Sequence, residues 1–220
     1  MKYLKIRLVC LCAGICLLMT ACSQNTFDAA AYVESAVESV YLGEHDSYEE
    51  FVGISQEEAE KTYQEHLRSE SMYFAEVFGF TQTDATLYRT MAFYRQLYNH
   101  SKFEAVSSEK MENGGYQVTM EISPVSLFPD HAAEIEKRVL DFSQMVSDGD
   151  FEGKSQKEID SAYCNYLLSF LELQLENTGW ESPKTITIEL SADNNTYAIS
   201  EKELMKIDEA LVLYESGEES

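Results

Sequence analysis

One group of potential metal ligands in the sequence lies between residues 148 and 153. Asp148, Asp150, Glu152 and Gly153 occupy the first, third, fifth and sixth places of a calcium-binding loop pattern, in which acidic side chains supply oxygen ligands and the glycine allows a sharp turn. The twelfth place of such a loop supplies a bidentate Glu, but here it is Ile159. Because the strongest ligand is missing, we expect a solvated loop between helices.

A second acidic stretch, Glu44-His45-Asp46 followed by Glu49 and Glu50, has the same character. Runs of charge of this kind are typical of solvated connections. We therefore expect no bound metal at either loop and no cofactor elsewhere. Cation binding at the two loops is the alternative that the sequence leaves open.

The sequence contains no motif that would assign a catalytic residue. It has no Gly-x-Ser-x-Gly, no His-Glu-x-x-His and no glycine-rich phosphate loop. With 39 Asp and Glu residues, any chosen pair of carboxylates is uninformative. The histidines lack metal-ligand spacing and lie in polar stretches, so we expect all four on the surface: His45, His66, His100 and His131.

Export is indicated by the first residues of the chain. Lys2, Lys5 and Arg7 form a positive segment, and residues 8–18 are an unbroken apolar or small run. That run is far shorter than the ~20 residues of a membrane-spanning helix, but it fits the apolar part of a removable signal peptide.

The segment Leu18-Met19-Thr20-Ala21 leads directly into Cys22. This ending resembles the lipobox of bacterial lipoproteins, although Met19 stands where Leu is usual. The resemblance implies cleavage before Cys22 and a lipid on its thiol, with acyl chains such as palmitate. Two acyl chains give stable membrane anchoring. The expected location is therefore the extracytoplasmic face of the cell membrane. The alternative is an ordinary secretory peptide with a cysteine at its boundary.

Composition restricts the partners of the chain. The formal net charge is −23, which repels nucleic acid and anionic lipid. We therefore expect no nucleic-acid partner, and membrane contact only through the lipid on Cys22. Hydrophobic residues make up 45% of the chain and aromatic residues 12%, which predicts a folded core. Cys164 is the single cysteine after Cys22, and we expect it to act as a small buried hydrophobe.

Helix and strand signals alternate along the rest of the chain. Asp28 caps a helix that ends at Gly43, Ser55 and Glu58 form a capping box for a helix that ends at Gly79, and a third helix covers about residues 84–99. A hairpin over residues 102–122 then turns at Asn113-Gly114. After Pro129 we expect a helix that ends at Gly149 and a second helix that begins with a capping box at Ser155 and Glu158. Strands follow at 186–190 and 197–199. The last helix begins with a third capping box, at Ser200 and Glu203.

Two of these signals recur. Ser55-Gln56 with Glu58 is repeated at Ser155-Gln156 with Glu158, and the strand at 118–122 is repeated at 186–190. Two matches in the same order indicate an internal duplication. We predict a helix-rich α+β fold built from two tandem related helix–helix–strand halves, with antiparallel β-hairpins packed on helices. The expected divisions are a signal peptide (1–21), a tether (22–27), one globular unit (28–214) with halves 28–124 and 129–214, and an acidic disordered tail (215–220).

The chain also resembles a family of small, acidic, functionally uncharacterised lipoproteins of Gram-positive, clostridial-type bacteria. The resemblance rests on Phe27-Asp28-Ala29, the Gly43 loop, the Ser55-Gln56 helix, residues 116–124 and residues 185–211. It implies a fold and a location but no activity. The expected function is a membrane-anchored, non-catalytic binding or interaction protein of the cell envelope, with an unknown protein or small-molecule partner. The alternative is an envelope enzyme, such as a hydrolase acting on wall material.

Overall fold

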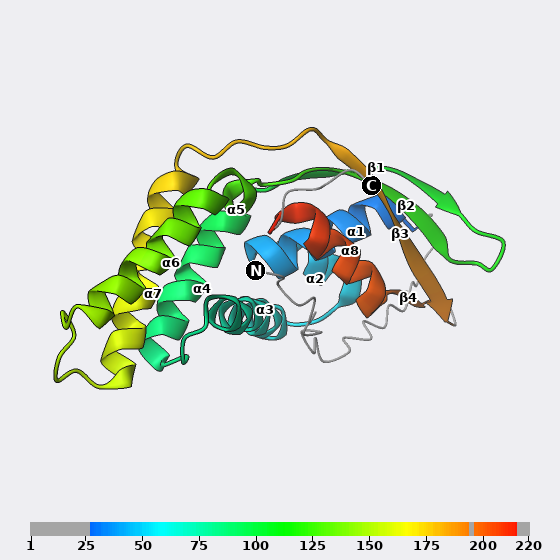
Figure 1. The fold of residues 1–220 in the computed structure, drawn as a ribbon. Coiled ribbons are helices and arrows are strands. Elements are labelled where there is room, and N and C mark those ends of the chain that lie inside the picture. Colours follow the sequence, from blue (N-terminus) through cyan, green and yellow to red (C-terminus); the bar gives the residue numbers. More distant parts are fainter. Residues whose placement is uncertain (1–26, 194–195, 215–220) are drawn as a thin grey trace.

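The computed structural model describes residues 27–193 and 196–214. The predicted signal peptide, Cys22 with nearly all of its tether, and the tail at 215–220 lie outside the described residues. Helices and one four-stranded antiparallel sheet make up the described part (Figure 1), which confirms the predicted α+β class.

The first helix begins and ends where its capping residues predict. The Asp28 carboxylate accepts a hydrogen bond from the backbone N–H of Ala31 at 3.0 Å, at the start of α1 (Ala29–Val37). A π-helical turn, η1 (Glu38–Leu42), follows and stops at Gly43, which has a φ of 74°. A Cβ at this position would lie 2.8 Å from the Tyr63 ring. Glycine is therefore required both by the left-handed backbone and by the close approach.

Three more helices complete the first helical part: α2 (Asp46–Val52), α3 (Gln56–Phe78) and α4 (Asp84–Tyr98). The capping box at the start of α3 is formed as predicted. The Ser55 hydroxyl accepts a hydrogen bond from the Glu58 N–H at 3.3 Å, and the Glu58 carboxylate accepts one from the Ser55 N–H at 3.1 Å. These bonds satisfy two backbone donors that a helix start would otherwise leave without a partner.

The sheet contains β1 (Lys102–Lys110), β2 (Tyr116–Ser123), β3 (Lys184–Asp193) and β4 (Thr196–Ile199), in that order. Strands β2 and β3 pair antiparallel, with Val118 opposite Ile188 and Met120 opposite Ile186. Val118, Met120 and Ile188 are fully buried. The alternating apolar and polar residues of the sequence predict one core face and one water face for each strand. This is confirmed for β2, whereas in β3 Ile188 and Leu190 are buried but Ile186 is only partly buried.

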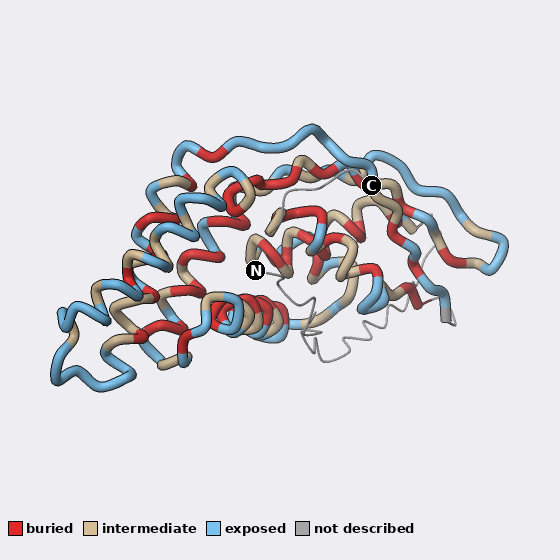
Figure 2. The backbone as a smooth tube through the Cα atoms, viewed as in Figure 1, coloured by how far each residue is buried: buried red, intermediate tan, exposed pale blue. Residues whose placement is uncertain are grey.

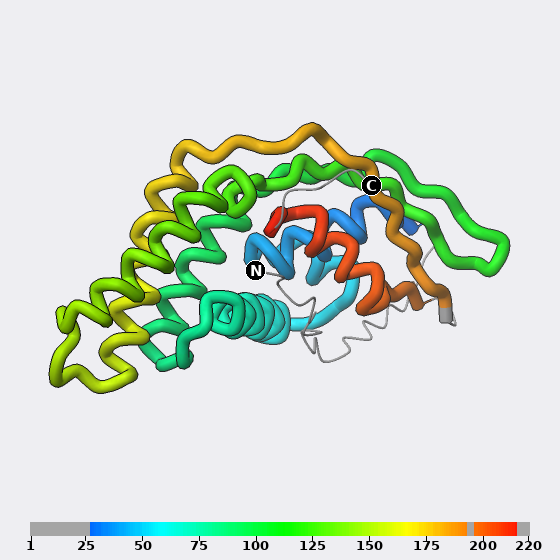
Figure 3. The backbone as a smooth tube through the Cα atoms, in the orientation of Figure 1, coloured from blue at the N-terminus to red at the C-terminus, as the bar shows by residue number. Residues whose placement is uncertain are grey.

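A helical excursion separates β2 and β3 in the chain although the two strands are neighbours in the sheet. It comprises α5 (Leu127–Asp130), α6 (Ala132–Ser147) and α7 (Gln156–Leu175), and a long segment returns from α7 to β3 (Figure 3). A capping box starts α7 as predicted, and the Glu158 carboxylate accepts a hydrogen bond from the Ser155 N–H at 2.9 Å.

Helix α6 is less buried than its sequence predicts. Its apolar stripe consists of Ile135, Val139, Phe142 and Val146, of which only Phe142 is buried. Much of the helix is coloured as exposed or intermediate in Figure 2. The stripe stays exposed because α6 packs mainly on α7 and α5 and makes no substantial contact with the sheet.

The last helix, α8 (Glu201–Leu211), corrects the prediction of a third capping box. Ser200 does accept a hydrogen bond from the Glu203 N–H at 3.4 Å. The Glu203 carboxylate, however, does not return to Ser200. It accepts bonds from the Glu189 N–H of β3 at 2.9 Å and from Lys206 at 2.6 Å. Glu203 therefore attaches α8 to the sheet.

The core lies between the sheet and the helices. Helices α1 and α8 pack on β2, together with β1 and β3 respectively, while α3 packs on η1 and α4, and α4 packs on α7. Aromatic side chains fill much of the space, and the largest fully buried ones are Tyr32, Tyr94, Tyr98, Phe74 and Phe93. The helical spacing of Tyr63, Tyr94, Tyr98 and Tyr163 predicts core positions for all four. The first three are core residues, whereas Tyr163 is only partly buried.

The internal duplication stays a prediction. Both capping boxes and both repeated strands are present. The repeated strands differ in place, however, because β2 is the second strand of its hairpin and β3 is the first strand of its own. A common origin of the halves therefore requires that the hairpins were joined differently.

Loss of the Ser55 cap should have a measurable cost. We expect Ser55→Ala to lower the free energy of unfolding by about 0.5–2 kcal/mol, because the Glu58 N–H loses its acceptor. Ser143→Ala, in the exposed interior of α6, is the matched control and should change it by less than about 0.5 kcal/mol. Urea unfolding of both variants measures the difference, and equal midpoints would refute the role of the cap.

Candidate functional site

A group of ionisable side chains is enclosed between α3 and α8. His66 and Glu70 lie one turn apart on α3 and therefore on the same helix face, and Asp208 comes from α8. A ring nitrogen of His66 and one carboxylate oxygen from each acid all lie within 4.8 Å of one another. His66 is 8% exposed and Glu70 is 5% exposed, while Asp208 retains part of its surface. We call these three residues the α3–α8 cluster.

Tyrosine hydroxyls supply the hydrogen bonds of the two carboxylates. The Tyr214 hydroxyl donates to Glu70 Oε2 at 3.1 Å, and it lies 3.2 Å from the hydroxyl of Tyr94. The Tyr98 hydroxyl donates to Asp208 Oδ1 at 3.5 Å. Each carboxylate thus receives a neutral donor, and no Lys or Arg of the described residues forms an ion pair with either one.

The His66 ring has aromatic neighbours, but its Nε2 has no hydrogen-bond partner in the part of the chain that the structure describes. Its ring centre lies 4.6 Å from that of Tyr41 and 5.3 Å from that of Tyr98. Its Nε2 atom is enclosed and has no partner among the described residues. Buried polar atoms are normally paired, and each exception calls for an explanation.

Burial shifts the ionisation of all three groups toward their neutral forms. It lowers the pKa of His66 to about 4 and raises the pKa of Asp208 to about 6. The pKa of Glu70 is raised well above its ordinary value, first by burial and then by the neighbouring charge of Asp208. Desolvation disfavours charge in each case, so the cluster has no built-in compensation for two ionised carboxylates.

The prediction that all four histidines are on the surface is wrong for His45 and His66, which are 5% and 8% exposed. The cause is visible in the spacing along α3. His66 and Glu70 fall between Tyr63, Leu67 and Phe74 at helical intervals and therefore share their inward face. A search for polar residues within the apolar stripe of this helix would have identified His66 and Glu70 as buried. His100 and His131 are partly exposed.

The acidic loops do not converge in the same way. Asp148, Asp150 and Glu152 are exposed, and among the described residues the α3–α8 cluster alone brings three metal-ligand atoms together. In the first loop the imidazole of His45 is buried and contacts Glu60 at 3.2 Å. Most acidic residues of the two stretches lie at the surface, as expected. The first stretch, however, is not a simple loop, because Asp46, Glu49 and Glu50 belong to α2, and Glu49 is only partly exposed.

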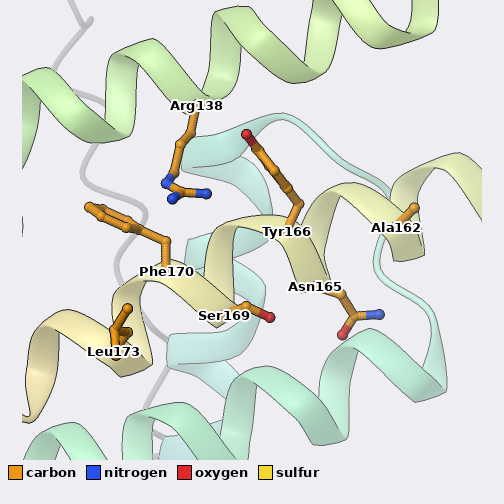
Figure 4. Close-up of a pocket in the computed structure, with 7 residues that line it drawn as sticks. All are labelled: Arg138, Ala162, Asn165, Tyr166, Ser169, Phe170 and Leu173. Carbon is orange, nitrogen blue, oxygen red and sulfur yellow. The ribbon is translucent and has the colours of Figure 1, made fainter. Parts of the chain in front are cut away.

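A shallow, open groove with a volume of about 410 Å³ lies along α7, with Arg138 of α6 at its edge (Figure 4). We call it the α6–α7 groove. Arg138 of α6 reaches toward two aromatic rings of α7, and its guanidinium carbon lies 4.3 Å from the centre of the Phe170 ring and 5.1 Å from that of Tyr166. The remaining lining is small, polar or apolar: Ala162, Asn165, Ser169 and Leu173. No carboxylate lines this groove.

The two cysteines of interest differ in position. Cys164 is buried, with its sulfur 3.7 Å from the Thr90 hydroxyl, and burial raises the pKa of its thiol. It is therefore the unreactive core residue that the sequence predicts. Cys22 lies outside the described residues. Within the described part of the chain, no helix combines the length and apolar character needed to span a membrane.

The comparisons with known proteins found a similarity of fold. No protein family matches the chain, and no curated protein is significantly similar to it. Among solved structures, the crystal structure of a candidate lipoprotein (ycdA) from Bacillus subtilis matches with a TM-score of 0.59 at 12% identity. The match covers 84% of this chain and 56% of that chain, so this chain spans little more than half of the neighbour's length.

At this identity the likeness shows a shared fold. It agrees with the coarser part of the predicted resemblance, to lipoproteins of Gram-positive bacteria, and supplies no support for a clostridial family.

The tyrosine hydroxyls around the cluster should contribute to stability. We expect Tyr214→Phe to lower the free energy of unfolding by about 1–3 kcal/mol, because Glu70 loses a donor in a buried position. Tyr88→Phe is the matched control, since Tyr88 is 70% exposed, and it should be neutral. Denaturant unfolding measures both, and equal stability of the two variants would contradict the proposed hydrogen bond.

Proposed function

We propose that the chain is a lipoprotein anchored through Cys22 at the extracytoplasmic face of the membrane, and that its folded part is a non-catalytic binding protein of the cell envelope. The export signal and the cysteine that follows it support the anchor. The candidate lipoprotein that shares the fold supports the same class of protein.

The observation that favours binding over hydrolysis is the composition of the α6–α7 groove. Hydrolysis of wall glycans typically needs two carboxylates beside the bond to be cleaved, and the groove has none. The carboxylates that do converge, Glu70 and Asp208, belong to the α3–α8 cluster and do not line the groove.

The groove instead offers one cation beside aromatic and apolar surface. Arg138 is its only charged lining residue, and no carboxylate of the described part of the chain lies within ion-pair distance of the guanidinium. A guanidinium binds carboxylate or phosphate oxygens through paired hydrogen bonds. Leu173, which is 58% exposed, provides adjacent apolar surface. The ligand that fits carries an anionic group next to an apolar or ring portion.

Lipid attachment is tested by metabolic labelling with a palmitate analogue. Wild type should carry the label, Cys22→Ala should carry none, and Cys164→Ala should remain labelled because its thiol is buried in the fold. Equal labelling of Cys22→Ala and wild type would refute an anchor at this residue.

Binding is tested by co-sedimentation of the detergent-extracted, full-length protein with purified cell-wall material. We expect the protein to sediment with the wall without releasing soluble sugar or peptide fragments. Arg138→Ala should weaken binding roughly 10-fold or more, because a charged hydrogen bond contributes about 1.5–3 kcal/mol. Lys157→Ala, an exposed cation at the start of α7, should bind as wild type does. Release of fragments would favour the enzyme alternative, and absence of sedimentation would refute wall binding.

A further inference from the structure

We propose that His66, Glu70 and Asp208 form a binding site for one divalent transition-metal cation, and that Zn²⁺ is the cation whose ligand preference they match best.

The positions of the three side chains suit a shared ion. His66 and Glu70 present their ligand atoms from successive turns of α3, and Asp208 approaches from α8. The three ligand atoms lie within 4.8 Å of one another. Zinc binds nitrogen and oxygen at about 2.0–2.2 Å in a tetrahedron, which places its ligands about 3.3–3.6 Å apart. Side-chain movements of about an ångström would bring the three atoms to that spacing.

The unpartnered nitrogen of His66 points independently to a ligand. The structure has two buried histidines, His45 and His66, which differ in whether their ring nitrogens have hydrogen-bond partners. In His45 both ring nitrogens have partners, with Nδ1 2.9 Å from the Ser39 hydroxyl and Nε2 3.2 Å from Glu60 Oε2. In His66 the enclosed Nε2 has none among the described residues. Coordination to a metal would satisfy an atom that otherwise costs free energy to bury.

The negative charges of the cluster also call for a bound cation. Two carboxylates, Glu70 and Asp208, lie together without a Lys or Arg partner in the described chain. Burying such a pair in ionised form is costly unless a positive charge accompanies it. A divalent cation neutralises both carboxylates.

The ligand types favour zinc over the alkaline-earth ions. Imidazole nitrogen with carboxylate oxygen is a common zinc set, whereas Ca²⁺ and Mg²⁺ prefer oxygen alone. Three protein ligands leave a fourth position for a small molecule. Asp208 is the most exposed residue of the cluster, so we expect an ion to enter from its side. A bound ion would link α8 to α3 and hold the C-terminal helix against the core.

Direct metal binding is the first test. The full-length protein, extracted in detergent and stripped with a chelator, is titrated with Zn²⁺ against a chromophoric competitor. We expect one Zn²⁺ per chain. Glu70→Gln, Asp208→Asn and His66→Gln should each weaken binding roughly 100-fold or more, since even loss of an outer-shell partner costs 10–100-fold. His45→Gln and Asp150→Asn are the matched controls, one a buried histidine and one an exposed acid, and should bind as wild type does.

Thermal unfolding provides a second readout that does not depend on every variant being equally stable. Without metal, Asp208→Asn should unfold at the same temperature as wild type or at a higher one, because it removes a buried negative charge. With saturating Zn²⁺ only the wild type should be stabilised, so the order of the two melting temperatures reverses. Absence of stoichiometric Zn²⁺ binding to wild type would overturn the proposal. Undiminished binding in all three cluster variants would also overturn it, as would a stabilisation specific to Ca²⁺ and lost in Asp150→Asn.

Discussion

The packing of α8 on the remainder of the core brings with it one costly arrangement, the burial of two carboxylates and an imidazole between helices that are far apart in sequence. Glu70 and Asp208 can lie together only when α8 is docked against α3. The sheet secures that docking from the other side. The Glu203 carboxylate accepts a hydrogen bond from a β3 N–H, and Lys206 donates to the carbonyl of Thr187 at 3.1 Å. Helix α8 is thus held by polar contacts on two faces.

The choice of tyrosine over phenylalanine at three positions follows from this arrangement. A phenylalanine would fill the core equally well, but it could not donate to a buried carboxylate. Tyr94, Tyr98 and Tyr214 combine both roles, since their rings pack in the aromatic core while their hydroxyls face Glu70, Asp208 or each other. Such a network stabilises a fold only if its members are satisfied. The nitrogen of His66 is the one member that lacks a partner in the described residues.

Local features of this fold could be predicted from sequence because they depend on neighbouring residues. The Asp28 and Ser55 caps, the Gly43 stop and the β2 alternation each follow from a few consecutive side chains.

The failures of prediction concern tertiary context. Glu203 occupies a capping-box position, but a strand N–H competes for its carboxylate. The apolar stripe of α6 gives no sign that the helix has few neighbours to cover it. His66 and Glu70 could have been placed on the inner face of α3, but their proximity to Asp208 depends on the path of the whole chain. No local pattern reports a contact of that kind.

Crystals grown with Zn²⁺ and measured at the zinc absorption edge would test the α3–α8 cluster most directly. The account predicts one strong anomalous peak per chain, within bonding distance of His66, Glu70 and Asp208. A map with no peak between α3 and α8, or with peaks only beside exposed residues such as Asp150 or His131, would contradict it.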